Sequence, residues 1–329
     1  MKLIIQIPCL NEEENLSQVL NELPESIPGI SDIEIVVIDD GSTDRTTEIA
    51  RDHGATLIEH KQNLGLGIAF KHGLQYALQQ NVDILVNTDA DNQYPSEYIP
   101  DLVKAVVEGE SDLVIGNRKP WKIKHFSKRK RFFQYAGSFV VRRLTSTNVP
   151  DAVSGFRAYS KAAMRSLNIT TKYSYVLDAI MQLSKKGLTI TSVPIKTNLP
   201  TRESRLFSNM FQHIFKSAVN VLRVYAIYEP FRTFLYLSLI FLIPGAFLGG
   251  RFIYFYVLGL GGGHIQSLIA TAILIINGVL LIVLGVIAEL LKTNRMIVEE
   301  MYAHMKASER KHQINSPGAL ATKQSHRVQ

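Results

Sequence analysis

Residues 82–91, VDILVNTDAD, form a short apolar run that ends in two carboxylates, Asp89 and Asp91. Such a run predicts a buried strand, and the carboxyl end of a strand is where open α/β sheets bind ligands. Two hard oxygen donors one residue apart suit Mg2+ or Mn2+, which usually take one or two protein carboxylates and fill their other positions with water and ligand phosphates. The alternative is a solvated turn, because an Asp-x-Asp pattern alone is a weak signal.

Strand and helix patterns alternate around this run, from residue 1 to about residue 115. Other strands are expected at 3–8, 33–38 and 56–59, helices at about 43–53 and from the loop 63–67 to about 79, and further strands and helices between 150 and 200. This alternation predicts an α/β fold with a mostly parallel central sheet and helices on both faces. Asn11 is expected to N-cap the first helix, with Glu12, Glu13 and Glu14 near the positive end of its dipole.

Two long uncharged stretches, 234–250 and 265–288, occupy much of the last third of the chain. With the aromatic residues after the first, each can cross a hydrocarbon core that takes about 20 residues. Lys and Arg flank the pair and are absent from the joining turn at 259–264. The positive-inside rule therefore places both termini in the cytoplasm. Arg251 is expected to snorkel to the far interface, and a buried core hairpin is the alternative.

These patterns divide the chain into four parts. They are an α/β domain at 1–204, amphipathic juxtamembrane helices at 205–230, a transmembrane hairpin at 231–291 with spans at about 232–256 and 265–289, and a cytoplasmic tail at 292–329 that is partly disordered. The amphipathic pattern fits a helix at a membrane surface, or a helix packed on the domain core. The start of the chain is expected to be a strand and not a signal peptide.

The chain has 329 residues, a net charge of +7 and a single cysteine, Cys9. One cysteine excludes an internal disulfide and fits a reducing cytosol. Residues 118–131, RKPWKIKHFSKRKR, concentrate the positive charge. Beside a membrane hairpin such a run favours anionic lipid headgroups over nucleic acid as its contact, so we expect no nucleic-acid partner. A homo-oligomer is left open.

Four segments are expected at strand ends, namely 8–12 (PCLNE), 39–42 (DDGS), 89–91 (DAD) and 116–118 (GNR). Together, over about residues 1–200, they resemble family 2 glycosyltransferases, whose nucleotide-sugar-binding domain has the GT-A type of α/β fold. The most similar branch is the polyprenyl-phosphate sugar transferases, which includes dolichol-phosphate mannose synthases and bacterial polyisoprenyl-phosphate glucosyltransferases. Residues 151–157 resemble the second signature of that branch, and the terminal membrane pair matches many prokaryotic members. Arg202 and Arg205 occupy the place of its late basic motif, where the family often has glycines and a lysine.

The resemblance implies a membrane enzyme that moves one hexose, with inversion, from a UDP- or GDP-sugar to a polyprenyl (undecaprenyl or dolichyl) phosphate. It implies Mg2+ or Mn2+ as the cofactor, held by Asp89, Asp91 and Gln93. The nucleotide sugar would contact Pro8, Leu10, Glu12, Asp39, Asn63, Gly65 and Asp89. The catalytic residues would be Asp91, Asp151 and Arg118, and the acceptor phosphate would contact Arg118, Arg131, Arg202 and Arg205.

The chemistry of the reaction fits these roles. Negative charge builds up on a nucleoside diphosphate as it leaves, and a divalent cation neutralises that charge. A lipid phosphate is already anionic near pH 7, so it needs cations to hold it more than a strong base. Structural alternatives stay open: a turn for Gln93 and the glycines, helix charge for Glu12, a helix cap for Asp40, and a hydrogen bond to the Ser154-Gly155 turn for Asp151.

Two other functions remain. A processive polysaccharide synthase shares the nucleotide-sugar domain, but we would expect more membrane spans and a Gln-x-x-Arg-Trp motif. The only tryptophan, Trp121, comes after Lys119 and Pro120, so that motif is absent. A non-catalytic membrane scaffold that merely kept the fold is the second alternative, and the intact Asp89, Asp91 and Arg118 argue against it.

Overall fold

The computed structural model describes residues 1–119, 142, 147, 149–169, 175–198, 226 and 228–315. The chain forms two compact units, Met1–Val221 and Leu222–Gln329. Most of the basic run at 118–131 and of the amphipathic segment at 205–230 lies outside the described residues.

The first unit contains a seven-stranded sheet with the strand order β3-β2-β1-β4-β6-β5-β7. Its strands are β1 Lys2–Cys9, β2 Asp32–Asp39, β3 Thr56–Glu59, β4 Ile84–Asn87, β5 Leu113–Asn117, β6 Arg157–Ser160 and β7 Ile190–Pro194. Every neighbouring pair is parallel except the two that involve β6, which is antiparallel to both β4 and β5. The expected mostly parallel α/β sheet is confirmed.

Strand β6 brings a distant loop to the carboxyl edge of the sheet. Arg157, its first residue, pairs with Asn87 at the end of β4 and with Ile115 near the end of β5. Because β6 runs the opposite way, the loop that leads into it lies at the edge of the sheet where β4 and β5 end. Residues 151–156 are thereby brought to the carboxyl ends of strands far away in sequence.

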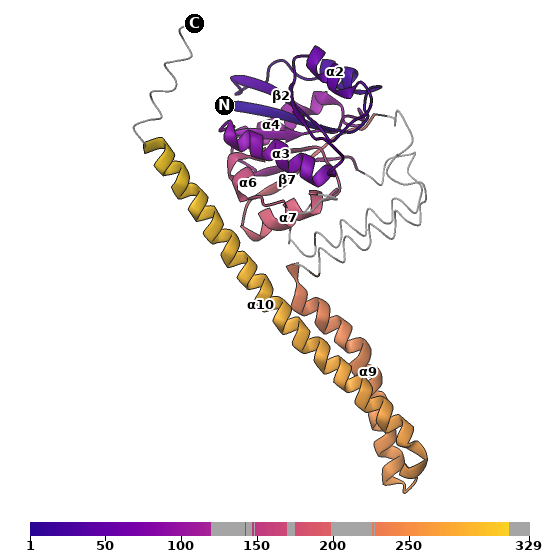
Figure 1. Cartoon of the computed structure of the whole chain (residues 1–329). Helices are drawn as coiled ribbons and strands as arrows, with labels where there is room; N and C mark the ends of the chain where they lie inside the picture. The colour runs from indigo at the N-terminus through magenta and orange to yellow at the C-terminus, as the bar shows by residue number, and fades with distance from the viewer. Residues whose placement is uncertain are drawn as a thin grey trace. The chain divides into compact units, whose positions relative to one another are not determined.

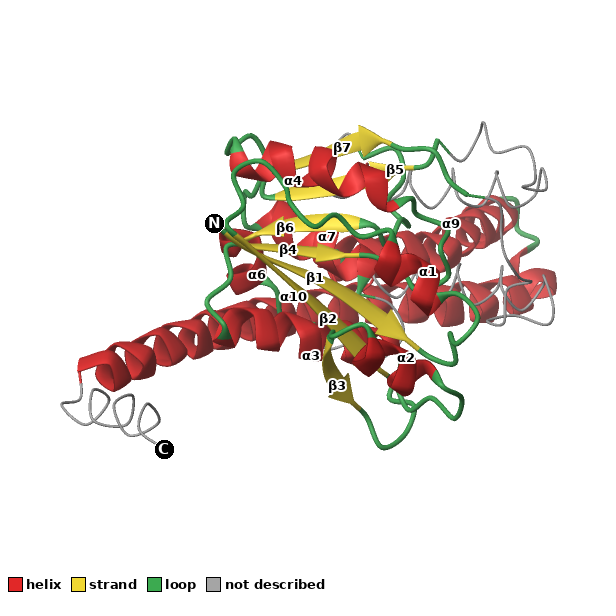
Figure 2. Cartoon of the chain, turned by 90° about the horizontal axis from the view of Figure 1, so that it is seen from above, coloured by secondary structure: helices red, strands yellow, loops and turns green. Residues whose placement is uncertain are grey.

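Helices cover both faces of the sheet (Figures 1 and 2). They are α1 Leu16–Asn21, α2 Thr46–Asp52, α3 Leu66–Gln79, the 3-10 turn η1 Ser96–Tyr98, α4 Ile99–Val107, α6 Lys161–Ser166 and α7 Val176–Lys185. Alternate side chains of a strand face opposite sides. Leu3, Ile5 and Ile7 of β1 accordingly join one apolar cluster with α1 and α4, and α3 packs against β1 and β2 as well.

A buried chain of hydrogen bonds ties the central strands to the loop before β6. The Gln6 side-chain nitrogen donates to Asn87 Oδ1 at 2.9 Å, and Asn87 Nδ2 donates to the Gly155 carbonyl at 3.0 Å. Gln6 and Asn87 are both fully buried. Buried polar groups are costly unless they are paired. These two hydrogen bonds therefore hold Gly155 at the carboxyl end of β4.

The second unit is a hairpin of two helices, α9 Pro230–Val257 and α10 Ile265–Asn315, joined by the short turn η3 Gly261–His264. Both helices are long and apolar enough to cross a membrane, with a mean hydropathy of 1.8 for Pro230–Val257 and 2.7 for Gly261–Val298. They approach closely at glycines: a Cβ atom at Gly278 would lie 2.5 Å from the Leu242 side chain.

Three details differ from the sequence-based expectations. Asn11 has a φ of 55° and does not cap a helix, and α1 begins at Leu16 after Asn15. The reason is that the Asn11 side chain accepts a hydrogen bond from the Thr43 amide instead. Helix α2 begins at Thr46, three residues later than expected. Helix α10 continues to Asn315, so the segment after residue 291 is helical that far, and residues 316–329 lie outside the described residues.

Candidate functional site

The turns after β1 and β2 are bound to each other. The Asn11 amide donates to Ser42 Oγ, and the Glu12 amide donates to Thr46 Oγ1, both at 2.8 Å. Glu12 and Asp39 are buried, at 8% and 3% exposure. The expected nucleotide-binding residues at 8–12 therefore lie beside Asp39, as their places at neighbouring strand ends predict.

Asp39 and Asp40 at the end of β2 have different partners. Among the described residues, the Asp39 carboxylate accepts a hydrogen bond only from the Ser42 amide, with its nearer oxygen at 3.1 Å. A carboxylate has about four acceptor positions, so Asp39 keeps capacity for a ligand. Asp40 Oδ1 instead accepts from the Leu64 amide at 2.9 Å and lies 2.7 Å from His60 Nδ1, and its other oxygen accepts from the Gly65 amide at 2.8 Å. The helix-cap alternative for Asp40 is wrong, because the carboxylate shapes the 60–65 loop.

Gly41 lets that loop approach. Its φ is +83°, and a Cβ atom there would lie 2.7 Å from the backbone carbon of Gln62. Asn63 is exposed, and Gly65, at φ 99°, is the N-cap of α3. The backbone of Gln62 and Asn63 consequently packs against Gly41, two residues after Asp39 in the chain.

Asp89 and Asp91 come after β4 at the same edge of the sheet. A Cβ atom on Gly155 would lie 3.2 Å from both oxygens of Asp89, so the loop before β6 packs directly against this carboxylate. Asp91 accepts from the Gln93 amide at 3.1 Å and from the Gln93 side-chain nitrogen at 2.8 Å. Gln93 thus orients Asp91. Burial, and then the charge of Asp91, raise the pKa of Asp89 to about 7.

The donor set of this pair fits a divalent cation. Two carboxylates in one partly buried place are the hard oxygen ligands that Mg2+ and Mn2+ take from proteins. Within the described residues, no group of three or more His, Cys, Asp or Glu side chains is arranged to hold a metal. A cation held by Asp89 and Asp91 would take water and ligand oxygens at its other positions, as Mg2+ usually does.

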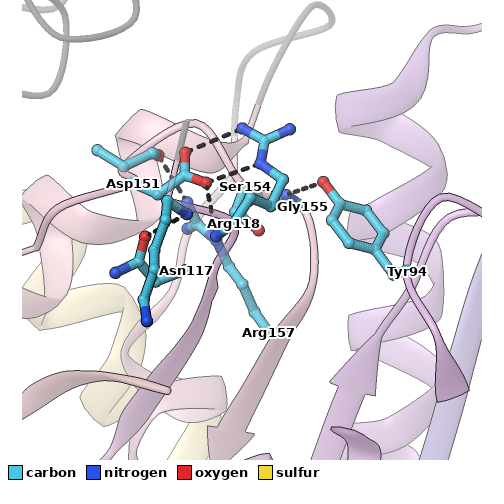
Figure 3. Close-up of polar contacts among 9 residues, drawn as sticks. Tyr94, Asn117, Arg118, Asp151, Ser154, Gly155 and Arg157 are labelled. Carbon is cyan, nitrogen blue, oxygen red and sulfur yellow. Dashed lines mark hydrogen bonds and ion pairs between the residues drawn. The ribbon is translucent and has the colours of Figure 1, made fainter. Parts of the chain in front are cut away.

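Arg118, directly after β5, forms a two-pronged pair with Asp151 (Figure 3). Its Nε donates to Asp151 Oδ2 at 2.7 Å and its Nη2 to Oδ1 at 2.9 Å, while the Arg118 amide donates to Oδ2 at 3.2 Å. The Asp151 side chain is fully buried and that of Arg118 is 11% exposed. Two of the five guanidinium N–H groups are used. In the described part of the chain the other three have no partner.

This pair changes the interpretation of both residues. From the sequence, Arg118 and Asp151 were expected to have separate roles, with a hydrogen bond to the Ser154-Gly155 turn as the structural alternative for Asp151. The structure shows both: the Asp151 carboxylate is bound to Arg118 through both oxygens, and the Asp151 main-chain carbonyl accepts from the Ser154 amide at 3.4 Å. A carboxylate held in this way orients the guanidinium.

Arg157 has a structural role that was not expected from the sequence. It is fully buried, and its guanidinium donates to the backbone carbonyls of Ser154, Val176 and Ala152 at 2.7–2.9 Å. It therefore clamps the loop that carries Asp151 and Gly155 onto the start of α7. The signal in the sequence was a charged residue inside the apolar segment GFRAY at 155–159.

The remaining expected residues divide in two. Pro8 is buried in β1 and Leu10 is partly exposed just beyond it. Arg131, Arg202 and Arg205 lie outside the described residues.

Comparison with known proteins gives consistent results. Residues 4–167 match the model described as glycosyl transferase family 2. An undecaprenyl-phosphate mannosyltransferase of Micrococcus luteus is 30% identical over 206 residues, which are 59% of this chain and 83% of the relative. A dolichol-phosphate mannosyltransferase of Pyrococcus furiosus is 31% identical over 216 residues, 63% and 59% of the two chains.

One solved structure illustrates the shared fold. Glucosyl-3-phosphoglycerate synthase of Mycobacterium tuberculosis, crystallised with Mn2+ and UDP-glucose, aligns with a TM-score of 0.52 at 22% identity. The alignment covers 68% of this chain and 78% of that one.

Gly41 and Gly54 offer a matched test of the loop packing. Both have positive φ, at +83° and +70°, but a Cβ atom meets backbone at Gly41 and open space at Gly54. Gly54→Ala should cost only the left-handed strain, about 1–2 kcal/mol. Gly41→Ala should cost about 1–3 kcal/mol more, measured as the shift in thermal unfolding of the full chain in detergent. Equal shifts for the two variants would contradict the close approach of residues 62–65.

Proposed function

Because the chain belongs to glycosyltransferase family 2, we propose that it transfers a single hexose from a UDP- or GDP-sugar to a polyprenyl phosphate at a membrane. The observation that carries the proposal is that one loop, residues 151–156, contacts both a carboxylate that can bind a cation and an arginine that can bind an anion. Gly155 packs on Asp89, and the same loop carries Asp151, which holds Arg118. An anion-binding arginine and a cation-binding acidic pair thus share one edge of the sheet.

The donor side is formed by the ends of β1, β2 and β4. Asp39, with its free acceptor capacity, would accept hydrogen bonds from the base or ribose, beside Pro8, Leu10 and Glu12. Asp89 and Asp91 would hold Mg2+ or Mn2+, with Gln93 orienting Asp91. When bound, the cation supplies neutralisation of the charge that develops on the diphosphate.

The acceptor side is formed by Arg118. Its three remaining N–H groups can hold a phosphate, and arginine binds phosphate through a planar fork of donors. Asp151 fixes the plane of that fork. The acceptor oxygen is already anionic, so attack on the anomeric carbon from the face opposite the leaving diphosphate requires no strong base and inverts the anomeric centre. Arg131, Arg202 and Arg205 would add positive charge to this side.

The names of relatives support the acceptor class. The Micrococcus luteus and Pyrococcus furiosus relatives are named for undecaprenyl phosphate and dolichol phosphate. Two helices apolar enough to cross a membrane fit a lipid acceptor. We propose that the hairpin at 231–291 anchors the catalytic domain, residues 1–204, on the cytoplasmic side.

Removing one carboxylate of the acidic pair tests the metal role. Asp91→Asn keeps the shape of the side chain but loses a charged oxygen ligand, so transfer from the nucleotide sugar should fall by at least about 100-fold, the loss of a few kcal/mol of transition-state stabilisation. EDTA should stop the wild-type reaction, and Mg2+ or Mn2+ should restore it. Asp101→Asn, an exposed aspartate in α4, is the control. Wild-type turnover of Asp91→Asn at saturating metal would refute the metal site.

Replacing the fork by a point charge tests the acceptor role of Arg118. In Arg118→Lys one ammonium cannot satisfy both Asp151 oxygens and a phosphate. The acceptor KM should rise or turnover should fall, while the dissociation constant of the nucleotide stays nearly unchanged. Arg165→Lys, an exposed arginine in α6, should change neither quantity. Unchanged lipid-phosphate kinetics in Arg118→Lys would place the acceptor phosphate elsewhere.

The proposed topology has its own test. With both termini on the cytoplasmic side, protease added outside sealed cells should leave a tag after Gln329 intact, and the tag should be cleaved once the cells are opened. Cleavage of the tag in sealed cells would reverse the topology and separate the catalytic domain from cytosolic donors.

A further inference from the structure

Helix α10 carries a polar residue where none is expected. Asn277 lies at the middle of the expected span 265–289 and is exposed. Its Nδ2 donates to the Ile273 carbonyl of its own helix at 2.8 Å. Among the described residues, its other N–H and its oxygen have no partner. In hydrocarbon an unpaired polar group is costly, and asparagine side chains there hydrogen-bond across helices.

Asn277 belongs to a regular stripe along α10. Positions spaced alternately by three and four residues hold Ile273, Leu280, Leu284, Ile287, Leu291 and Val298, interrupted by Asn277 and Asn294. All of these residues are exposed. The spacing is the heptad repeat that packs helices side by side in a coiled coil. The stripe passes through the span and continues beyond it.

The stripe is not the face that α9 covers. The contacts of α10 with α9 include Gly278, which meets Leu242, and Gly285, which meets Phe231 and Phe234. Leu274 and Ile275 of α10 likewise meet Gly245 of α9. Gly278 is one residue and about 100° away from Asn277 on the helix. The Phe231 amide lies 3.5 Å from Glu289, near the start of α9. Beyond that level α10 continues for a further 26 residues, so its heptad pattern extends past the part that α9 accompanies.

We propose that α10 forms a parallel, in-register coiled coil with α10 of a second copy of this chain. All copies of a membrane protein insert in the same direction, so two such helices meet in parallel. In register, each Asn277 faces the partner subunit's Asn277, and the two amides can donate to and accept from each other. Asn294 repeats the arrangement two to three heptads further on. This inference rests on the proposed membrane insertion of the hairpin.

Self-complementarity favours a second copy over another protein. A single asparagine at a core position of a coiled coil sets register and oligomeric state. Here the two asparagines fall in different core positions of the repeat, 17 residues apart. Only a helix with polar side chains at the same two levels can form hydrogen bonds with both Asn277 and Asn294. An identical helix that runs parallel and in register has its own two asparagines at those levels.

Cysteine cross-linking of the full chain tests the geometry. Val298→Cys lies on the stripe, and Met296→Cys lies on the opposite face at a similar exposure, 64% against 53%. The native Cys9 is buried at 3% exposure, so the unmodified chain is the background. In dilute proteoliposomes with a mild oxidant, Val298→Cys should give at least about tenfold more disulfide-linked dimer than Met296→Cys. Equal or absent cross-linking in active, membrane-inserted protein would overturn the coiled coil and leave the proposed function standing.

Substitution of Asn277 tests the polar contact itself. Asn277→Leu should weaken dimerisation in the membrane about tenfold, the size expected for one interhelical amide contact. Asn277→Gln keeps the amide and should retain the dimer, and Val279→Leu, exposed off the stripe, should have no effect. Dimerisation of Asn277→Leu as strong as that of the unmodified chain would show that Asn277 does not join the copies.

Discussion

The antiparallel insertion of β6 between β4 and β5 is the constraint on which the site depends. Without it, the loop at 151–156 would lie at the opposite edge of the sheet from Asp89 and Arg118. With it, Gly155 lies against Asp89 and is held by Asn87. Arg157 holds the same loop through hydrogen bonds to three backbone carbonyls. One reversed strand therefore brings the acidic pair and the arginine together.

The energetics of the Arg118–Asp151 pair depend on the geometry of its contact. Burying two charges is expensive, and attraction offsets the cost only with good geometry and further hydrogen bonds. Here the contact is two-pronged, and the Arg118 amide donates a third hydrogen bond to the same carboxylate. Loss of one partner would leave the other charge buried and unpaired, at a cost of about 3–5 kcal/mol. The two-pronged contact thus favours one orientation of the guanidinium.

Much of this could be predicted from the sequence, because strand ends in a parallel sheet share one edge. The strands ending at Asp39, before Asp89 and before Arg118 were located in this way. The cap predicted for Asn11 was wrong because a polar side chain at a strand end can form a hydrogen bond to another turn. Helix-capping preferences do not show which partner such a side chain takes. The Arg118–Asp151 pair could not be predicted, because it depends on the direction of β6, and a four-residue strand does not reveal its pairing. The structural role of Arg157 was missed because its partners are backbone carbonyls, which the sequence does not identify.

The chemical nature of the lipid product is the sharpest test of the proposed transfer of one sugar to a lipid phosphate. Purified full-length protein would be incubated with a panel of UDP- and GDP-sugars, a divalent cation and a short polyprenyl phosphate, and the lipid product analysed by mass spectrometry. We expect, for at least one donor, a polyprenyl phosphate that carries a single hexose, with release of one nucleoside diphosphate per lipid. A lipid-linked polymer, or hydrolysis of every donor without a lipid product, would contradict it.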